Sequence, residues 1–85
     1  MVDPSRLVPD RQVAPIATIA AAIAAHLERC PNSSDTVDGI QLWWVGPLVP
    51  GATLENTFLA LQLLERQGLV ERSDLAGRSL WHRPR

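Results

Sequence analysis

Residues that could act as nucleophiles, bases or metal ligands are few and widely spaced. His26 lies in an alanine-rich stretch, His82 lies near the end of the chain, and Cys30 is the one cysteine. The sequence contains no HExxH, no CxxC and no glycine-rich phosphate loop. Asp35 and Asp38 stand where a helix is expected to begin, so capping accounts for both. Because catalysis needs such groups within reach of one another, we expect no enzyme activity, metal, cofactor or small-molecule substrate.

Positive charge near the C-terminal end is the second feature that could support chemistry. The groups that carry it are Arg72, Arg78, His82, Arg83 and Arg85, interspersed with the acids Glu71 and Asp74. These arginines either contact an anionic partner or remain solvated and paired with nearby acids. The chain as a whole has a formal net charge of −1, so its overall field does not attract phosphate.

The elements that must position these groups begin with a helix from about Pro15 to Cys30. A chain of 85 residues that is 46% hydrophobic is long enough for one domain. Residues 1–12 lack periodicity and are assigned to a flexible N-terminal arm, and residues 13–85 to the domain. Proline is favourable in the first turn of a helix, and apolar residues recur at helical spacing from Ile16 to Leu27.

A second helix is expected from Thr36 to about Val45, with Ser34 or Asp35 as its N-cap. One apolar face of this helix would carry Val37, Ile40 and Trp44. Leu42 and Trp43 would point elsewhere. Residues 46–52 contain two prolines and two glycines and form an extended connector.

A third helix is expected over residues 54–67, followed by a β-hairpin. Thr53 is suited to the N-cap of this helix and Gly68 to its C-terminal end. Residues 69–72 and 78–83 have strand lengths, and residues 73–77 have the composition of a turn. We expect Val70 and Leu80 to face the helices, and Trp81 and Arg83 to alternate to the other face.

Two stretches of this region match a known pattern. The sequence "LALQLLERQGLVER" (59–72) resembles the third helix and first wing strand of winged helix-turn-helix domains, and "AGRSLWHR" (76–83) is similar to their wing tip and return strand. The resemblance implies an α+β fold, a winged helix of three helices followed by a two-stranded β-hairpin wing. In DNA-binding members, the third helix enters the major groove.

The resemblance also suggests which residues would touch DNA. These candidates are Asn56, Gln62 and Arg66 on the helix and Arg78 and Arg83 on the wing, where Arg78 stands at the position that such folds insert in a minor groove. However, affinity for DNA depends largely on several cationic contacts to phosphate, and the helix supplies one arginine beside Glu55. A DNA-binding transcriptional regulator is therefore the alternative expectation.

Large apolar residues outside the core stripes favour a protein partner. The candidate interface residues are Trp43, Phe58, Leu59, Leu63 and Trp81. Exposed apolar patches on small domains usually mark contacts, and tryptophan is enriched where interfaces carry most of their energy. The competing interpretation is that the core covers these side chains. Our first expectation is a protein–protein interaction module that uses an apolar face of helices two and three to bind another protein or a second copy of itself.

The sequence also bears on location. The apolar run from Val13 to Ala25 is shorter than the roughly 20 residues that a transmembrane helix needs. The charges before this run cancel, whereas a signal peptide would begin with positive charge. A single cysteine fits a reducing compartment. We expect a cytoplasmic protein without membrane contact.

Overall fold

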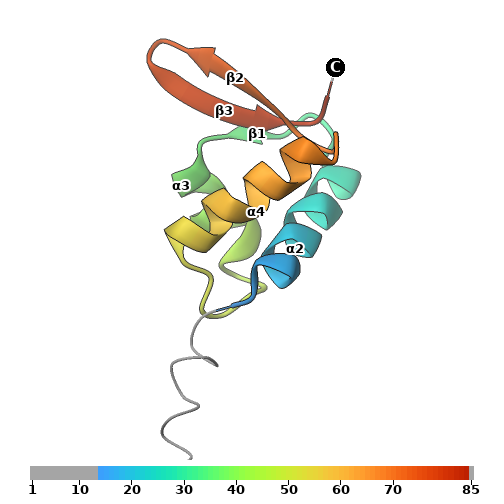
Figure 1. Ribbon diagram of the computed structural model, residues 1–85, viewed down its shortest axis with the longest axis vertical. Coiled ribbons are helices and arrows are strands. Elements are labelled where there is room, and N and C mark those ends of the chain that lie inside the picture. Colours follow the sequence, from blue (N-terminus) through green and yellow to red (C-terminus); the bar gives the residue numbers. More distant parts are fainter. Residues whose placement is uncertain (1–13, 85) are drawn as a thin grey trace, which may run out of the picture.

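The computed structural model describes residues 14–84, so the predicted arm and Arg85 lie outside the described residues. The elements in chain order are α2 (Ile16–Arg29), β1 (Ser34–Asp35), α3 (Val37–Gly39), the π-helix η2 (Ile40–Val45), α4 (Leu54–Arg66), β2 (Glu71–Leu75) and β3 (Arg78–His82). Figure 1 shows α2 and α4 side by side, with the β2–β3 hairpin projecting at one end. The architecture is α+β, as the sequence predicted.

Helix α2 confirms the first predicted helix. Ile19, Ala20, Ile23 and Leu27 are its buried residues, and they follow the apolar stripe of helical period. The backbone N–H of Cys30 donates to the carbonyl of His26 at 2.8 Å, and Pro31 follows. The helix therefore ends at the predicted place because proline disfavours helical backbone in the residue before it.

The second predicted helix is correct in position but wrong in type. Thr36 is the N-cap of α3, and its hydroxyl accepts from the N–H of Gly39 at 3.2 Å. Asp35 accepts from the N–H of Thr36 at 2.8 Å instead of capping the helix itself. Beyond Gly39 the chain widens into η2, which ends with the N–H of Gly46 donating to the carbonyl of Gln41. Such a bond spans five residues, which is the π-helical pattern.

Helix α4 begins and ends with the predicted signals. The Thr53 hydroxyl accepts from the N–H of Asn56 at 3.0 Å. At the other end Gly68 has φ +77°, and the N–H groups of Gly68 and Leu69 donate to the carbonyls of Glu65 and Leu64. This pair of bonds is the Schellman ending, in which glycine adopts positive φ without a steric penalty.

The sheet has three strands in the order β1-β3-β2, which corrects the expected two-stranded hairpin. The added strand, β1, pairs antiparallel with the end of β3. Strand β2 runs through residues 73–75, where a turn was expected, because the turn needs only two residues. Ala76 and Gly77 both have positive φ, 53° and 78°, as in the type I′ turns that join hairpin strands.

The hairpin presents Trp81 to the helices, which corrects the predicted face. Trp81 is 2% exposed and belongs to the core, whereas Leu80 is partly exposed. Successive side chains of a strand point to opposite faces of the sheet. An error of one residue in the predicted alternation therefore places every side chain on the wrong face. Arg72 pairs with Trp81 across the ladder. As an interface candidate Trp81 is therefore inaccessible to a partner, because its ring is already buried.

Candidate functional site

The most exposed large side chain among the described hydrophobics belongs to Trp43, which is 73% exposed. Leu42 beside it is 55% exposed, and Leu48 in the following connector is 60% exposed. We call these three residues the η2 surface. No charged residue occurs from Gly39 to Leu54. This part of the chain therefore presents apolar groups to solvent without ionic groups among them, an arrangement that marks contact sites.

The π-helical turn explains why these residues point outward. Ile40, Trp44 and Val45 are all buried on η2. A turn closed over five residues brings Ile40 and Val45 to the same side, so Leu42 and Trp43 occupy the opposite side. In the connector, the N–H of Val49 donates to the carbonyl of Val45 at 2.8 Å, and Val49 is buried while Leu48 is exposed.

Close backbone packing holds η2 at its end. A Cβ atom added to Gly46 would lie 2.8 Å from the carbonyl oxygen of Gln41 and 3.1 Å from that of Leu42, which leaves no room for a side chain. The Gln41 side-chain amide donates to the carbonyl of Ala52 at 3.0 Å and ties the connector to η2. The close packing at Gly46 and the hydrogen bond from Gln41 to Ala52 therefore hold the segment that carries the η2 surface.

Beneath the η2 surface, Trp44 stacks on His26 of α2 with ring centroids 4.2 Å apart. Nε2 of His26 is also 3.1 Å from the hydroxyl of Ser33. Burial lowers the pKa of His26 below 6.5, and the positive charge of Arg29 lowers it further. The imidazole is a packing group between α2, η2 and the loop before β1.

The interface candidates on α4 differ in how much of each side chain is exposed. Phe58 and Leu59 are each 37% exposed. Phe58 also meets Trp81 edge-on, with ring centroids 6.2 Å apart. Leu63 is partly buried against the core, so little of it is available to a partner. Leu54 is 47% exposed and was not among the candidates, because its place in the helical repeat suggested a core residue.

The DNA-contact candidates on α4 are only partly available. The Asn56 amide donates to the carbonyl of Ala14 at 3.2 Å and so fixes the beginning of the described chain. Gln62 is partly buried, and Arg66 is exposed directly after the exposed acid Glu65. Arg66 is the single cation of α4, so this helix offers phosphate less attraction than DNA binding usually requires.

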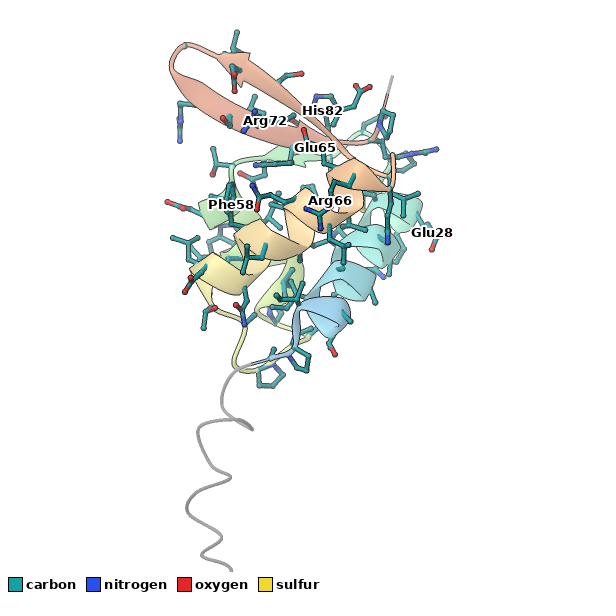
Figure 2. All side chains as sticks on the ribbon, viewed as in Figure 1. Glu28, Phe58, Glu65, Arg66, Arg72 and His82 are labelled. Carbon is teal, nitrogen blue, oxygen red and sulfur yellow. The ribbon has the colours of Figure 1, made fainter. Side chains whose placement is uncertain are left out.

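The arginines of the hairpin and of the residue that follows it differ in their surroundings. The Arg72 guanidinium lies 5.7 Å from the centroid of the Trp81 ring, in the cation–π range. Arg78 and Arg83 are both exposed at the two ends of β3. Figure 2 shows Arg72 on the hairpin above α4, and Phe58 on the helix side. Of the hairpin arginines, Arg72 is therefore in contact with an aromatic ring, and Arg78 lies beside the turn.

His82 is buried on the opposite face of the sheet from Trp81. It is 5% exposed. Its Nε2 lies 2.7 Å from the Ser73 hydroxyl, and its Nδ1 lies 2.8 Å from the carbonyl of Arg83. A carbonyl only accepts, so Nδ1–H donates to it, and Nε2 shares a hydrogen bond with the hydroxyl. The sequence did not suggest this contact, because the residues are brought together by strand pairing.

The described residues hold neither a metal-binding cluster nor a membrane-spanning helix. Within residues 14–84, no cluster of three or more His, Cys, Asp or Glu residues could hold a metal ion. No helix in the same range has the length and apolar character needed to cross a membrane. Comparison with protein families, curated proteins and solved structures finds no match to this chain.

Proposed function

We propose that the protein is a small non-enzymatic interaction module that binds another protein, or a second copy of itself, through the η2 surface. The observation that carries the proposal is the 73% exposure of Trp43 within an uncharged stretch of chain. Burying a large apolar side chain contributes about 1.5 to 3 kcal/mol, and tryptophan is among the residues that dominate interface energies. Phe58 and Leu59 on α4 are each 37% exposed as well.

The scaffold of this module is a winged helix in our proposal. Two observations support it. If α3 and the η2 that continues it are taken as one helix, the elements follow the order helix, strand, helix, helix, strand, strand, and the sheet order is β1-β3-β2. In addition, the stretches 59–72 and 76–83 resemble the third helix and wing of that superfamily. In this scaffold α4 is the third helix, and the β2–β3 hairpin is the wing.

The choice of a protein partner over DNA follows from charge. Described residues 14–84 contain five arginines against seven acids, and α4 carries one cation. Non-specific affinity for DNA comes from neutralising phosphates with several cations. An uncharged apolar surface, in contrast, loses little hydration energy when it is covered by another apolar surface.

The test compares the wild-type chain with Trp43→Asp and Leu42→Asp by sedimentation equilibrium at micromolar concentrations, and by quantitative recovery of partners from the native host. Leu75→Asp is the matched control, because Leu75 is 65% exposed on β2, outside the η2 surface. We expect the first two variants to lose association and the control to retain it. Association that survives both Trp43→Asp and Leu42→Asp would show that the η2 surface is not the contact.

DNA binding is the second candidate, and the exposure of Arg66, Arg78 and Arg83 favours it. Fluorescence anisotropy with mixed-sequence duplex DNA tests it at low salt, where counterion release is most favourable. Binding that weakens with salt and is lost in Arg78→Ala would support a regulator. Absence of binding at low salt would leave the protein-interaction proposal as the better one.

A further inference from the structure

Strand β1 covers only part of one edge of β3. It pairs with β3 at two positions, Ser34 with His82 and Asp35 with Trp81. On the other side, β2 pairs along the whole of β3, ending at Leu75 with Arg78. The chain leaves β1 at Thr36, which caps α3. Within the described residues, the first half of β3 therefore has an edge without a neighbouring strand.

The backbone of Ser79 faces this open edge. In an antiparallel pair, residues alternate between turning their N–H and C=O groups toward one neighbour and toward the other. A two-residue turn closes the hairpin on a hydrogen-bonded pair, so Arg78 and Leu80 turn their backbone groups toward β2. Ser79 and Trp81 turn theirs the other way. Trp81 meets Asp35 of β1 there, whereas no strand lies opposite Ser79.

A groove of about 300 Å³ lies beside this edge, between the hairpin and the helices. Val37, Phe58 and Trp81 supply its apolar lining, and Ser79 forms part of the wall on the strand side. Phe58 packs edge-on against Trp81, which is itself buried. The groove therefore offers an apolar floor directly beneath an unpaired strand edge.

Two arginines border the groove and make it net positive. Arg72 and Arg78 line it together with one acid, Asp38. The Arg72 guanidinium lies 5.7 Å from the centroid of the Trp81 ring, and both arginines are exposed to solvent. A carboxylate is the preferred planar partner of a guanidinium group. This charge excess distinguishes the groove from the uncharged η2 surface.

We propose that the groove binds an extended segment of a partner protein in which an apolar residue lies between acidic residues, and that the segment adds to β3 as an antiparallel strand in line with β1. Addition of a peptide to a sheet edge is a general recognition mode, in which backbone bonds give affinity and alternate side chains give specificity. The residue opposite Ser79 places its side chain on the floor formed by Val37 and Phe58. Its neighbour opposite Arg78 points to the outer face, where an acidic side chain meets that arginine.

The test uses a capped peptide with the central sequence Glu-Leu-Glu and amide NMR of the isotope-labelled full chain. We expect chemical-shift changes at Ser79 and at the Trp81 indole, and slower hydrogen exchange of the Ser79 amide. A Lys-Leu-Lys peptide tests the charge requirement, and a Glu-Leu-Glu peptide with an N-methylated Leu tests the backbone bond. Both are expected to bind weakly or not at all.

Variants locate the site. We expect Arg78→Ala to raise the Kd of the acidic peptide about tenfold, because this change removes a charge-assisted hydrogen bond. Arg66→Ala is the matched control, since Arg66 is exposed on α4 and does not line the groove. The amide spectrum of each variant verifies folding, and Arg78→Ala is the decisive variant because Arg78 is exposed at the surface.

Several outcomes would overturn the proposal. These are no spectral change at millimolar acidic peptide, equal binding of the Lys-Leu-Lys peptide, or changes confined to the η2 surface. If duplex DNA changes the chemical shifts of the groove residues and acidic peptide does not, the two arginines would be assigned to phosphate binding instead. The groove and the η2 surface are tested separately, because Trp43→Asp is expected to leave peptide binding unchanged.

Discussion

The ring of His26 on α2 lies nearly parallel to the ring of Trp44 on η2, at 4.2 Å between centroids and 15° between planes. The contact joins two helices that each contribute to the core, and the hydroxyl of Ser33 is 3.1 Å from Nε2 of the same histidine. Because Leu42 and Trp43 lie directly before Trp44 in the chain, this stack also supports the segment that carries the η2 surface.

The His26 contact predicts a pH dependence of stability. Burial, and secondarily Arg29, lower the pKa of His26 in the folded state below its ordinary value of 6.5. The unfolded state then binds the proton more readily, so the contribution of His26 to stability is fully present above pH 6.5 and is lost as the pH falls toward and through the folded-state pKa. We expect urea midpoints to decrease between about pH 7.5 and about pH 5.

The control for this prediction is His26→Phe, which keeps an aromatic ring against Trp44 but cannot titrate. The difference between the wild-type and variant midpoints, followed across the same pH range, isolates the contribution of His26 from that of other groups. A difference that does not change with pH would contradict the assignment.

Trp43 and Trp81 are expected to respond in opposite ways to truncation. Trp81 is 2% exposed, whereas Trp43 is 73% exposed. Trp81→Ala leaves a cavity in the core and is expected to cost about 3 to 5 kcal/mol of unfolding free energy. Trp43→Ala is expected to change it by less than about 0.5 kcal/mol in the monomer. Chemical denaturation of the two variants measures both values, and similar losses would contradict the assigned exposures.

The hairpin turn contains a position that a substitution should improve. Ala76 has φ 53°, a left-handed conformation that costs an ordinary L-residue roughly 1 to 2 kcal/mol, whereas asparagine tolerates it in type I′ turns. We expect Ala76→Asn to raise the free energy of unfolding by about 1 kcal/mol. Ala76→Val should lower it, because β-branched residues strongly disfavour positive φ. Thermal unfolding distinguishes the two directions, and a destabilised Ala76→Asn variant would argue against this turn geometry.

Gly39 is expected to resist replacement despite its place in a helix. A Cβ atom there would collide with the Asp35 carboxylate, which accepts from the N–H of Thr36 at 2.8 Å. Glycine to alanine usually stabilises a helix by up to about 1 kcal/mol. Here we expect Gly39→Ala to destabilise by about 1 kcal/mol, because the displaced carboxylate loses its bond.

A double-mutant cycle tests the cause of the Gly39 effect. If the collision with Asp35 is responsible, Gly39→Ala should be less harmful in an Asp35→Ala background, and the two changes should be non-additive. Equal effects of Gly39→Ala in both backgrounds would place the strain elsewhere. Denaturant titration of the four proteins gives the coupling free energy.

Much of the fold was predictable because the signals for it are local. Thr53 and Gly68 marked the two ends of α4 through a cap hydrogen bond and a positive φ, each decided within a few residues. The stripe on α2 had the correct period. The strand β1 was missed because it is two residues long and exists only through its pairing with β3.

The candidate residues were predictable to a smaller extent. The expectation of an outward-pointing Trp43 agrees with its exposure, since it lay off the stripe of its helix. Trp81 was placed on the wrong face, because the side that a hairpin buries depends on the register of the turn. Nothing in the sequence indicated that the amide of Asn56, a DNA-contact candidate, donates to the carbonyl of Ala14, because the two residues lie far apart in the chain.

By itself, the sequence determined where helices begin and end, the α+β composition of the chain, and the uncharged character of residues 39–54, because caps, periodicity and charge are properties of short segments. The tertiary structure alone decided that η2 is a π-turn with Val45 inside, that Trp81 is core, and that Ser79, Arg72 and Arg78 share a groove. These features depend on which segments, far apart in the chain, pack against one another, and no local sequence pattern specifies that packing.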